Sequence, residues 1–144
     1  MTLKQIVMLI FVVAAFSFYP VSNVYAAFPE PYTETKDITD SDKSFNIKDN
    51  VVTVSYSRPA RPMQPFNIMF KFEKDNIKSL SYTTNMIMNM GRYIFNPEEI
   101  SDNIYTVTPT LPKCGSGRTL WYGLINLTYD NGVEDKLIFF YNVK

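Results

Sequence analysis

A chain of 144 residues with 14 basic and 14 acidic side chains is long enough for one domain with a sizeable core. The balanced charge argues against a nucleic-acid partner, because such partners select a basic excess, and it gives no support for a membrane-surface role. Histidine is absent, which argues against an ordinary zinc site and against catalysis that depends on an imidazole.

Residues 1–26 have the features of a secretory signal peptide. Lys4 supplies a short positive region, and residues 6–21 form an apolar run. Small side chains then stand three residues and one residue before the expected cleavage site, which follows Ala26. We therefore expect an exported protein that is periplasmic or secreted.

A retained membrane anchor is the alternative interpretation of this segment. A spanning helix needs about 20 apolar residues, and Pro20 and the polar residues after it shorten the run. We expect no stable membrane insertion after cleavage. The remaining chain, residues 27–144, loses only Lys4 among the charged side chains, which leaves a net charge of −1.

The next segment, residues 27–43, predicts an extended leader. It contains two prolines and several acidic residues and shows no apolar periodicity. We expect the folded domain to occupy residues 44–144.

Short β-strands are the pattern of this domain. Residues 51–56 are rich in β-branched side chains, and the apolar residues of 67–73 alternate so that they share one face. Three prolines between these segments, each without a backbone donor, predict a loop or a sheet edge at residues 58–65.

The second half of the chain continues in the same way. Further strands are expected at residues 77–90 (one strand or two), 93–95, 104–108, 119–129 and 136–143. The last two flank Asn131-Gly132, a strong hairpin signal, and no segment has sustained helical periodicity. About six to eight short strands with Pro, Gly and Asn turns predict a single antiparallel, immunoglobulin-like β-sandwich. We expect Trp121 to be buried in it together with Leu137 or Phe139.

Five methionines lie beyond the N-terminal segment, and three of them, Met86, Met88 and Met90, alternate. Thioether sulfurs are soft donors, and soft donors select Cu(I). On a strand these side chains would share one face about 6.5–7 Å apart, too far for all three to hold one ion. Two could meet where the strand ends, and Gly91 permits such an end by adopting a positive φ. The alternative is that methionines fill irregular gaps in the core.

Cys114 is the single cysteine, so it cannot form an intramolecular disulfide. It lies in a glycine-containing loop between Lys113 and Arg118, and nearby cations lower a thiol pKa and favour the thiolate that binds metal. The alternative is an inert, buried thiol. Nucleophilic catalysis by Cys114 is disfavoured because no histidine is present to act as a base.

The order of these features resembles small bacterial periplasmic domains of the FixH-like and YtkA-like group. The resemblance covers residues 68–143 and rests on Met-x-Met-x-Met-Gly-Arg at residues 86–92, an aromatic strand, Leu-Pro-x-Cys at residues 111–114, and Trp121. It implies an immunoglobulin-like sandwich with a methionine-rich strand and a link with copper handling or with assembly of copper-containing oxidases. The absence of histidine departs from a Cu(II) pattern and leaves Cu(I).

We therefore expect an exported, non-enzymatic module that binds Cu(I). The candidate ligands are Met86, Met88, Met90 and Cys114. Met63 and Met69 are weaker candidates. Trp121 would shield the site, and the partner would be a copper acceptor or another envelope protein. The alternative is a metal-free structural or interaction sandwich that presents an edge strand or the proline-rich loop to a partner. An enzyme is disfavoured because no positioned acid–base pair is evident.

Overall fold

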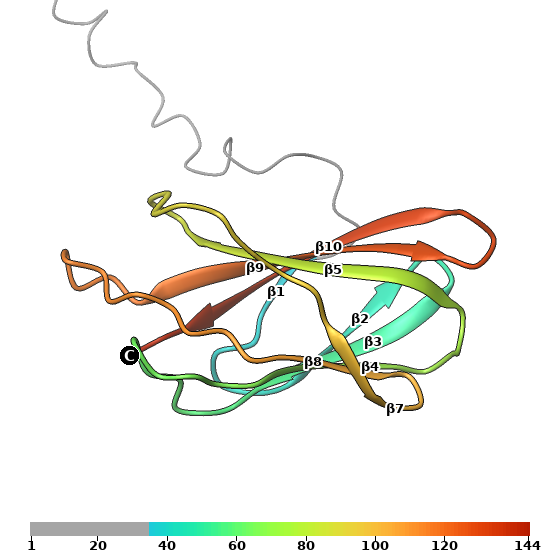
Figure 1. The fold of residues 1–144 in the computed structure, drawn as a ribbon, viewed down its shortest axis with the longest axis horizontal. Helices are drawn as coiled ribbons and strands as arrows, with labels where there is room; N and C mark the ends of the chain where they lie inside the picture. Colours follow the sequence, from blue (N-terminus) through green and yellow to red (C-terminus); the bar gives the residue numbers. More distant parts are fainter. Residues whose placement is uncertain (1–34) are drawn as a thin grey trace, which may run out of the picture. The chain divides into compact units, whose positions relative to one another are not determined.

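The computed structural model describes residues 35–144, which form two five-stranded sheets (Figure 1). In chain order the strands are β1 (Thr35–Asp37), β2 (Lys43–Ile47), β3 (Asn50–Tyr56), β4 (Ile68–Phe72), β5 (Ile77–Met86), β6 (Tyr93–Phe95), β7 (Glu98–Ser101), β8 (Ile104–Val107), β9 (Leu120–Tyr129) and β10 (Glu134–Asn142). One sheet has the order β1-β10-β9-β5-β6 and the other has the order β2-β3-β4-β8-β7. All neighbours are antiparallel except β1 and β10. The prediction of an all-β, immunoglobulin-like sandwich is confirmed.

The core lies between the two sheets and is largely aromatic. Alternation along β4 and β9 turns every second side chain inward, as a period of two requires. Phe70 of one sheet lies against Phe139 of the other, with ring centroids 6.3 Å apart. Trp121 is 1% exposed and Leu137 and Phe139 are fully buried, so the predicted burial of these side chains is confirmed.

The sheets begin earlier in the chain than the expected domain start at residue 44. β1 pairs in parallel with β10, and Ile38, which follows it, is fully buried. A strand of three residues is too short to show a periodicity in the sequence, and its acidic neighbours suggested an extended leader. The predicted signal peptide at residues 1–26 and the leader residues 27–34 lie outside the described residues.

β7 is a second strand that the sequence pattern did not predict. All four of its residues are exposed, so no apolar alternation marks it. β2 precedes the first segment that we predicted as a strand. Together with β1, these strands raise the number in the described range to ten, above the six to eight expected.

Two predicted connections are confirmed. The proline-rich loop at 58–65 lies outside the named strands and makes only isolated bridges, from Ala60 to Val143 and from Pro65 to Thr110. Gly132 adopts φ +81° in the hairpin between β9 and β10, where its N–H donates to the carbonyl oxygen of Tyr129 at 2.9 Å. The described range contains no helix with the length and apolar character needed to cross a bilayer.

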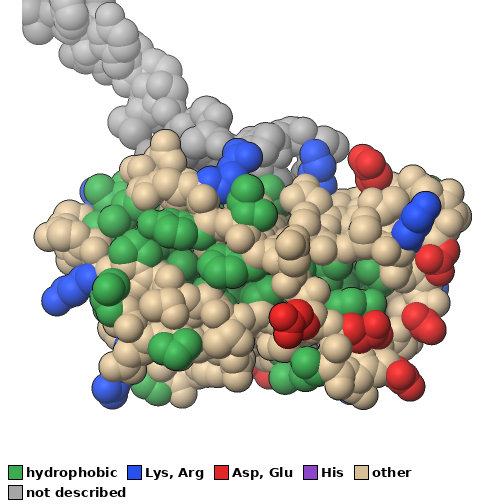
Figure 2. Space-filling model, viewed as in Figure 1, with side chains coloured by type: hydrophobic (Ala, Val, Ile, Leu, Met, Phe, Trp, Pro, Cys, Tyr) green, Lys and Arg blue, Asp and Glu red, His purple; other side chains and the backbone are tan. Residues whose placement is uncertain are grey.

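The two ends of the sandwich differ in charge. Acidic side chains gather toward the end that carries the β9–β10 hairpin, on the right of the face shown in Figure 2. At the opposite end β5 stops and β9 starts, because Met86 pairs with Trp121 near these termini. The segments at this end, residues 87–92 and 112–119, carry the candidate ligands and are called the sulfur end below.

Candidate metal centre

A buried asparagine ends β5 and folds the methionine segment into a turn. The Asn85 side-chain oxygen accepts hydrogen bonds from the backbone N–H of Met86 at 2.8 Å and of Met90 at 3.0 Å. Its amide nitrogen donates to Asn89 Oδ1 at 2.8 Å. Such side-chain bonds offer the backbone an alternative to a sheet ladder, which is why a short asparagine favours a turn here.

The expected strand over residues 77–90 therefore ends at Met86. The Asn89 N–H donates to the carbonyl oxygen of Met86 at 2.9 Å, and Asn89 itself has φ +54°. Gly91 has φ +106°, the positive φ that the sequence suggested for a strand end at this point. Because the chain turns, Met88 points outward and is 42% exposed, whereas Met86 stays in the core.

The cysteine loop is a second turn. The Gly117 N–H donates to the carbonyl oxygen of Cys114 at 3.1 Å, and Gly117 adopts φ +74°. The four residues after Cys114 are exposed, but Cys114 itself is only 6% exposed. Cys114 is thus buried at the start of an exposed turn.

The neighbours of this thiol include one candidate ligand. Cys114 Sγ lies 3.4 Å from Met88 Sδ and 3.0 Å from Ser116 Oγ, and Ser116 Oγ lies 3.6 Å from the same Met88 sulfur. Two sulfurs that share one ion through bonds of about 2.3 Å can be at most about 4.6 Å apart. The Met88–Cys114 pair lies within that limit.

Hydrogen bonding lowers the pKa of the Cys114 thiol. The largest cause is the Ser116 hydroxyl, followed by the backbone N–H of Ser116; the backbone N–H and positive charge of Arg118 add smaller effects, while partial burial opposes them. The sequence suggested Lys113 and Arg118 as the cause, and it missed Ser116. A hydroxyl two residues after a cysteine in a glycine turn is the signal that could have identified it.

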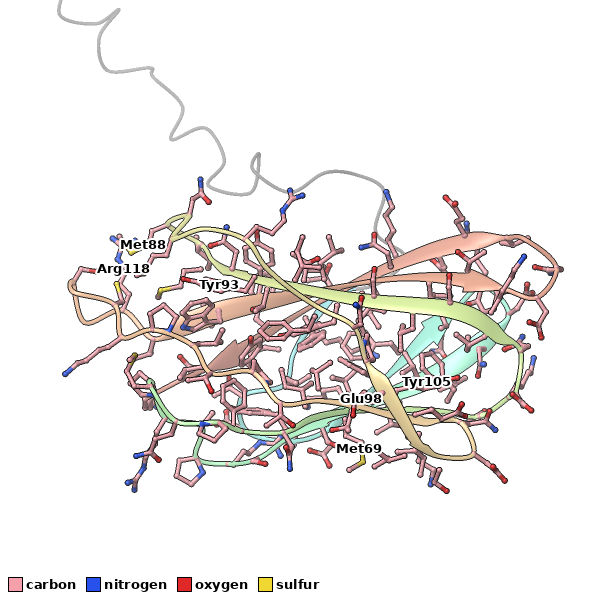
Figure 3. The ribbon with its side chains drawn as sticks, in the orientation of Figure 1. Met69, Met88, Tyr93, Glu98, Tyr105 and Arg118 are labelled. Carbon is pink, nitrogen blue, oxygen red and sulfur yellow. The ribbon has the colours of Figure 1, made fainter. Side chains whose placement is uncertain are left out.

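A hollow of about 270 Å³ lies between the two turns, and Met88 is the member of the sulfur pair that lines it. Its lining residues are Met86, Ile87 and Met88 from one segment, and Gly117, Arg118, Thr119 and Leu120 from the other. Figure 3 shows Met88 and Arg118 together at this end of the domain. The hollow is therefore bordered by two thioethers, apolar side chains and one guanidinium.

The other candidate ligands have different surroundings. Met86 belongs to the buried core, as its register partner Trp121 does, and Met90 is half-buried against that core. Met69 is 37% exposed on β4 of the opposite sheet, and Met63 is exposed in the proline-rich loop. The structure thus brings Met88 and Cys114 into contact, places Met86 at the rim of the same hollow, and keeps Met69 in the other sheet.

In residues 35–144, no three His, Cys, Asp or Glu side chains form a group that could hold a metal ion. This part of the chain therefore shows no conventional site for a hard or borderline metal ion. The Met88–Cys114 pair differs in kind, because one of its donors is a thioether. Its chemistry would suit a soft ion that accepts few ligands.

Comparisons with known proteins identify no family for this chain. No protein-family model matches it, and no curated protein matches its sequence. Among solved structures it is similar to CopC from Methylosinus trichosporium OB3b, with 14% identity, a TM-score of 0.39, and coverage of 70% of this chain and 95% of that chain. A likeness of this size does not bear on function, which must come from the residues of the chain itself.

Proposed function

We propose that this domain is a non-enzymatic module that binds one Cu(I) ion through Cys114 Sγ and Met88 Sδ. The observation that carries the proposal is the 3.4 Å contact between these two soft donors, which lie 26 residues apart in the chain. Thiolate and thioether together select Cu(I) over Zn(II), because thioethers are poor zinc ligands. The lowered pKa of the thiol supports this role, since the thiolate is the form that binds metal.

The surroundings of the pair fit a transfer site better than a permanent one. Met88 is 42% exposed, so a partner can approach its sulfur without opening the core. Met86 also lines the hollow, but it is 1% exposed and belongs to the core, so the two proposed ligands are Met88 and Cys114. We infer that copper enters and leaves by exchange of ligands, with Trp121 and its core neighbours keeping the inner side of the site dry.

We also propose that the protein is exported and works in the periplasm or outside the cell. The features of residues 1–26 and the resemblance of residues 68–143 to FixH-like and YtkA-like domains support this location. Mass spectrometry of the protein from the cell envelope tests it. The expected mature N-terminus is Ala27, and recovery of only the full-length chain would contradict cleavage.

A competition titration against a Cu(I) chelator tests the ligand pair in the reduced protein. We expect the wild type to bind about one Cu(I), and Cys114→Ser and Met88→Leu each to lower the affinity by at least about tenfold, because even outer-shell changes cost that much at metal sites. Met69→Leu is the matched control, since Met69 is 37% exposed and lies in the other sheet. It should titrate like the wild type.

Stability measurements test whether a loss of copper binding in these variants is caused merely by unfolding. Leucine keeps roughly the volume of methionine, so Met88→Leu should change the free energy of unfolding of the apo protein by less than about 1.5 kcal/mol. Indistinguishable copper curves for the wild type and the two site variants would overturn the proposal. The metal-free interaction sandwich would then be the better account, with Ile94 and Ile100 exposed on β6 and β7 as its natural contacts.

A further inference from the structure

The sulfur end is basic on the sides that surround the proposed copper site. Residues 87–92 and 112–119 contain Arg92, Lys113 and Arg118, all exposed, and no acidic residue. Asp40 and Asp42 lie in the β1–β2 connection beside the proline-rich loop, where Asp42 pairs with Arg58 at 2.7 Å. Three exposed cations on these two segments would attract a negatively charged molecule to this end.

The opposite end is richer in acidic side chains, although Lys48 and Lys74 also lie there. Its acidic side chains, in the connections next to the β9–β10 hairpin and at the start of β10, are Asp49, Glu73, Asp75, Asp102, Asp130 and Glu134. Hydrogen bonds join these connections, for example from the Asn131 amide to Asp49 Oδ2 at 3.3 Å. The domain as a whole is close to neutral. This separation of charge therefore directs an approaching anion to one end of the domain instead of attracting it to the whole surface.

Arg118 places one of the cations at the hollow itself. Its guanidinium has no hydrogen bond or ion pair to the rest of residues 35–144, and it borders the hollow together with Ile87 and Leu120. The space of about 270 Å³ lies just below the usual range of ligand pockets, which matches a molecule of few atoms. Its lining suits a molecule with an apolar body and a carboxylate.

We propose that this hollow receives a small organic thiol that bears a carboxylate and delivers Cu(I) to the sulfur pair. The inference rests on the function proposed above. The carboxylate of the carrier pairs with Arg118, its carbon chain contacts Ile87 and Leu120, and its sulfur brings the ion beside Met88 and Cys114. The bond from Cu(I) to the carrier sulfur breaks, a bond to Cys114 Sγ forms, and the thiol proton of Cys114 passes to the carrier. Copper stays Cu(I) throughout.

Loading rates from two carriers test the proposal. Cu(I) is supplied to the reduced protein either as its complex with mercaptosuccinate, which carries carboxylates, or as its complex with 2-mercaptoethanol, which does not. We expect the wild type to load faster from mercaptosuccinate, with an advantage that shrinks as the salt concentration rises. Arg118→Gln should reduce that advantage by about tenfold, because it removes a charge-assisted hydrogen bond to the carboxylate.

Two controls make the result specific. Lys74→Gln removes a positive charge from the acidic end and should leave the ratio of the two rates unchanged. The ratio also cancels any effect of Arg118 on the thiol, since both carriers meet the same thiol. An unchanged ratio in Arg118→Gln would overturn the carrier proposal while the copper function stood. If neither carrier loaded the protein with copper, the copper function itself would be overturned, and this inference with it.

Discussion

The interior of the sandwich and its sulfur end are built by different means. The interior depends on alternation along strands, and its aromatic side chains contact one another between the sheets, as Phe70 does with Tyr82 and Phe139. The sulfur end depends on turns held by a few polar side chains, above all by the three hydrogen bonds of Asn85. The first region therefore sets the stability of the domain, and the second can change its chemistry with little effect on stability.

The largest effect that this comparison predicts is at Trp121, the largest fully buried side chain. Trp121→Ala should lower the free energy of unfolding by about 3–5 kcal/mol, because a large cavity is left in a packed core. Denaturant titration of the reduced apo protein measures it. A loss below about 1 kcal/mol would mean that the interior does not depend on this residue and would break the comparison.

Gly123 tests the interior by overpacking instead. A Cβ at this position would lie 2.4 Å from Phe139 Cζ and 2.7 Å from Tyr82 Cε2. Both rings are locked in the core, so Gly123→Ala should cost about 1–3 kcal/mol. Gly115→Ala is the matched control, because a Cβ there would have no atom within 4 Å. Equal stabilities of the two variants would contradict the description of a tightly packed interior.

The interior was the part of the fold that the sequence predicted well. β4, β9 and β10 alternate or carry long apolar runs because one face of each is buried, and burial is what a periodic pattern reports. β1 is too short to show a period, and β7 has no buried face. The position of β1 follows from pairing with the distant strand β10, which a local pattern does not contain, whereas β7 pairs with its neighbour β8 without burying a face.

For the sulfur end, the sequence predicted the donor chemistry but not which donors lie together. Soft donors marked Met88 and Cys114 as candidates, but nothing in the spacing of the methionines distinguished Met88 from its neighbours. That distinction comes from the Asn85 contacts, which turn the chain after Met86 and direct Met88 toward a loop 26 residues later. Contacts between two irregular segments depend on the whole fold.

Asn85→Ala should therefore disturb the sulfur end much more than the interior. It leaves the backbone N–H groups of Met86 and Met90 without their acceptor, which should cost about 1–2 kcal/mol. It should also speed hydrogen exchange at the Met90 amide and weaken Cu(I) binding, since Met88 is no longer held near Cys114.

A matched control for this change is Asn131→Ala, at the opposite end of the sandwich. Asn131 makes a similar but exposed contact, accepting the Val133 N–H at 3.0 Å. Its loss should change stability by no more than about 0.5 kcal/mol and leave copper binding intact. Equal copper affinity of Asn85→Ala and the wild type would show that the turn does not position the methionine.

The smallest structural effect, and the most specific chemical one, is expected at Ser116. Its hydroxyl is the main cause of the lowered pKa of Cys114, so Ser116→Ala should raise that pKa and leave less thiolate at neutral pH. The rate of thiol alkylation, followed against pH, should then rise at a higher pH than in the wild type. Ser116→Thr keeps a hydroxyl and should restore the original profile.

Copper binding gives the same test a second readout. Because Cu(I) binds the thiolate, Ser116→Ala should weaken binding at neutral pH and match the wild type at a pH above both thiol pKa values. The folded protein itself should hardly respond, since Ser116 is exposed and touches the buried core cluster only through its hydrogen bond with Cys114. An unshifted alkylation profile would show that the hydroxyl does not control the thiol. A large loss of stability would show that the sulfur end contributes to folding as the interior does.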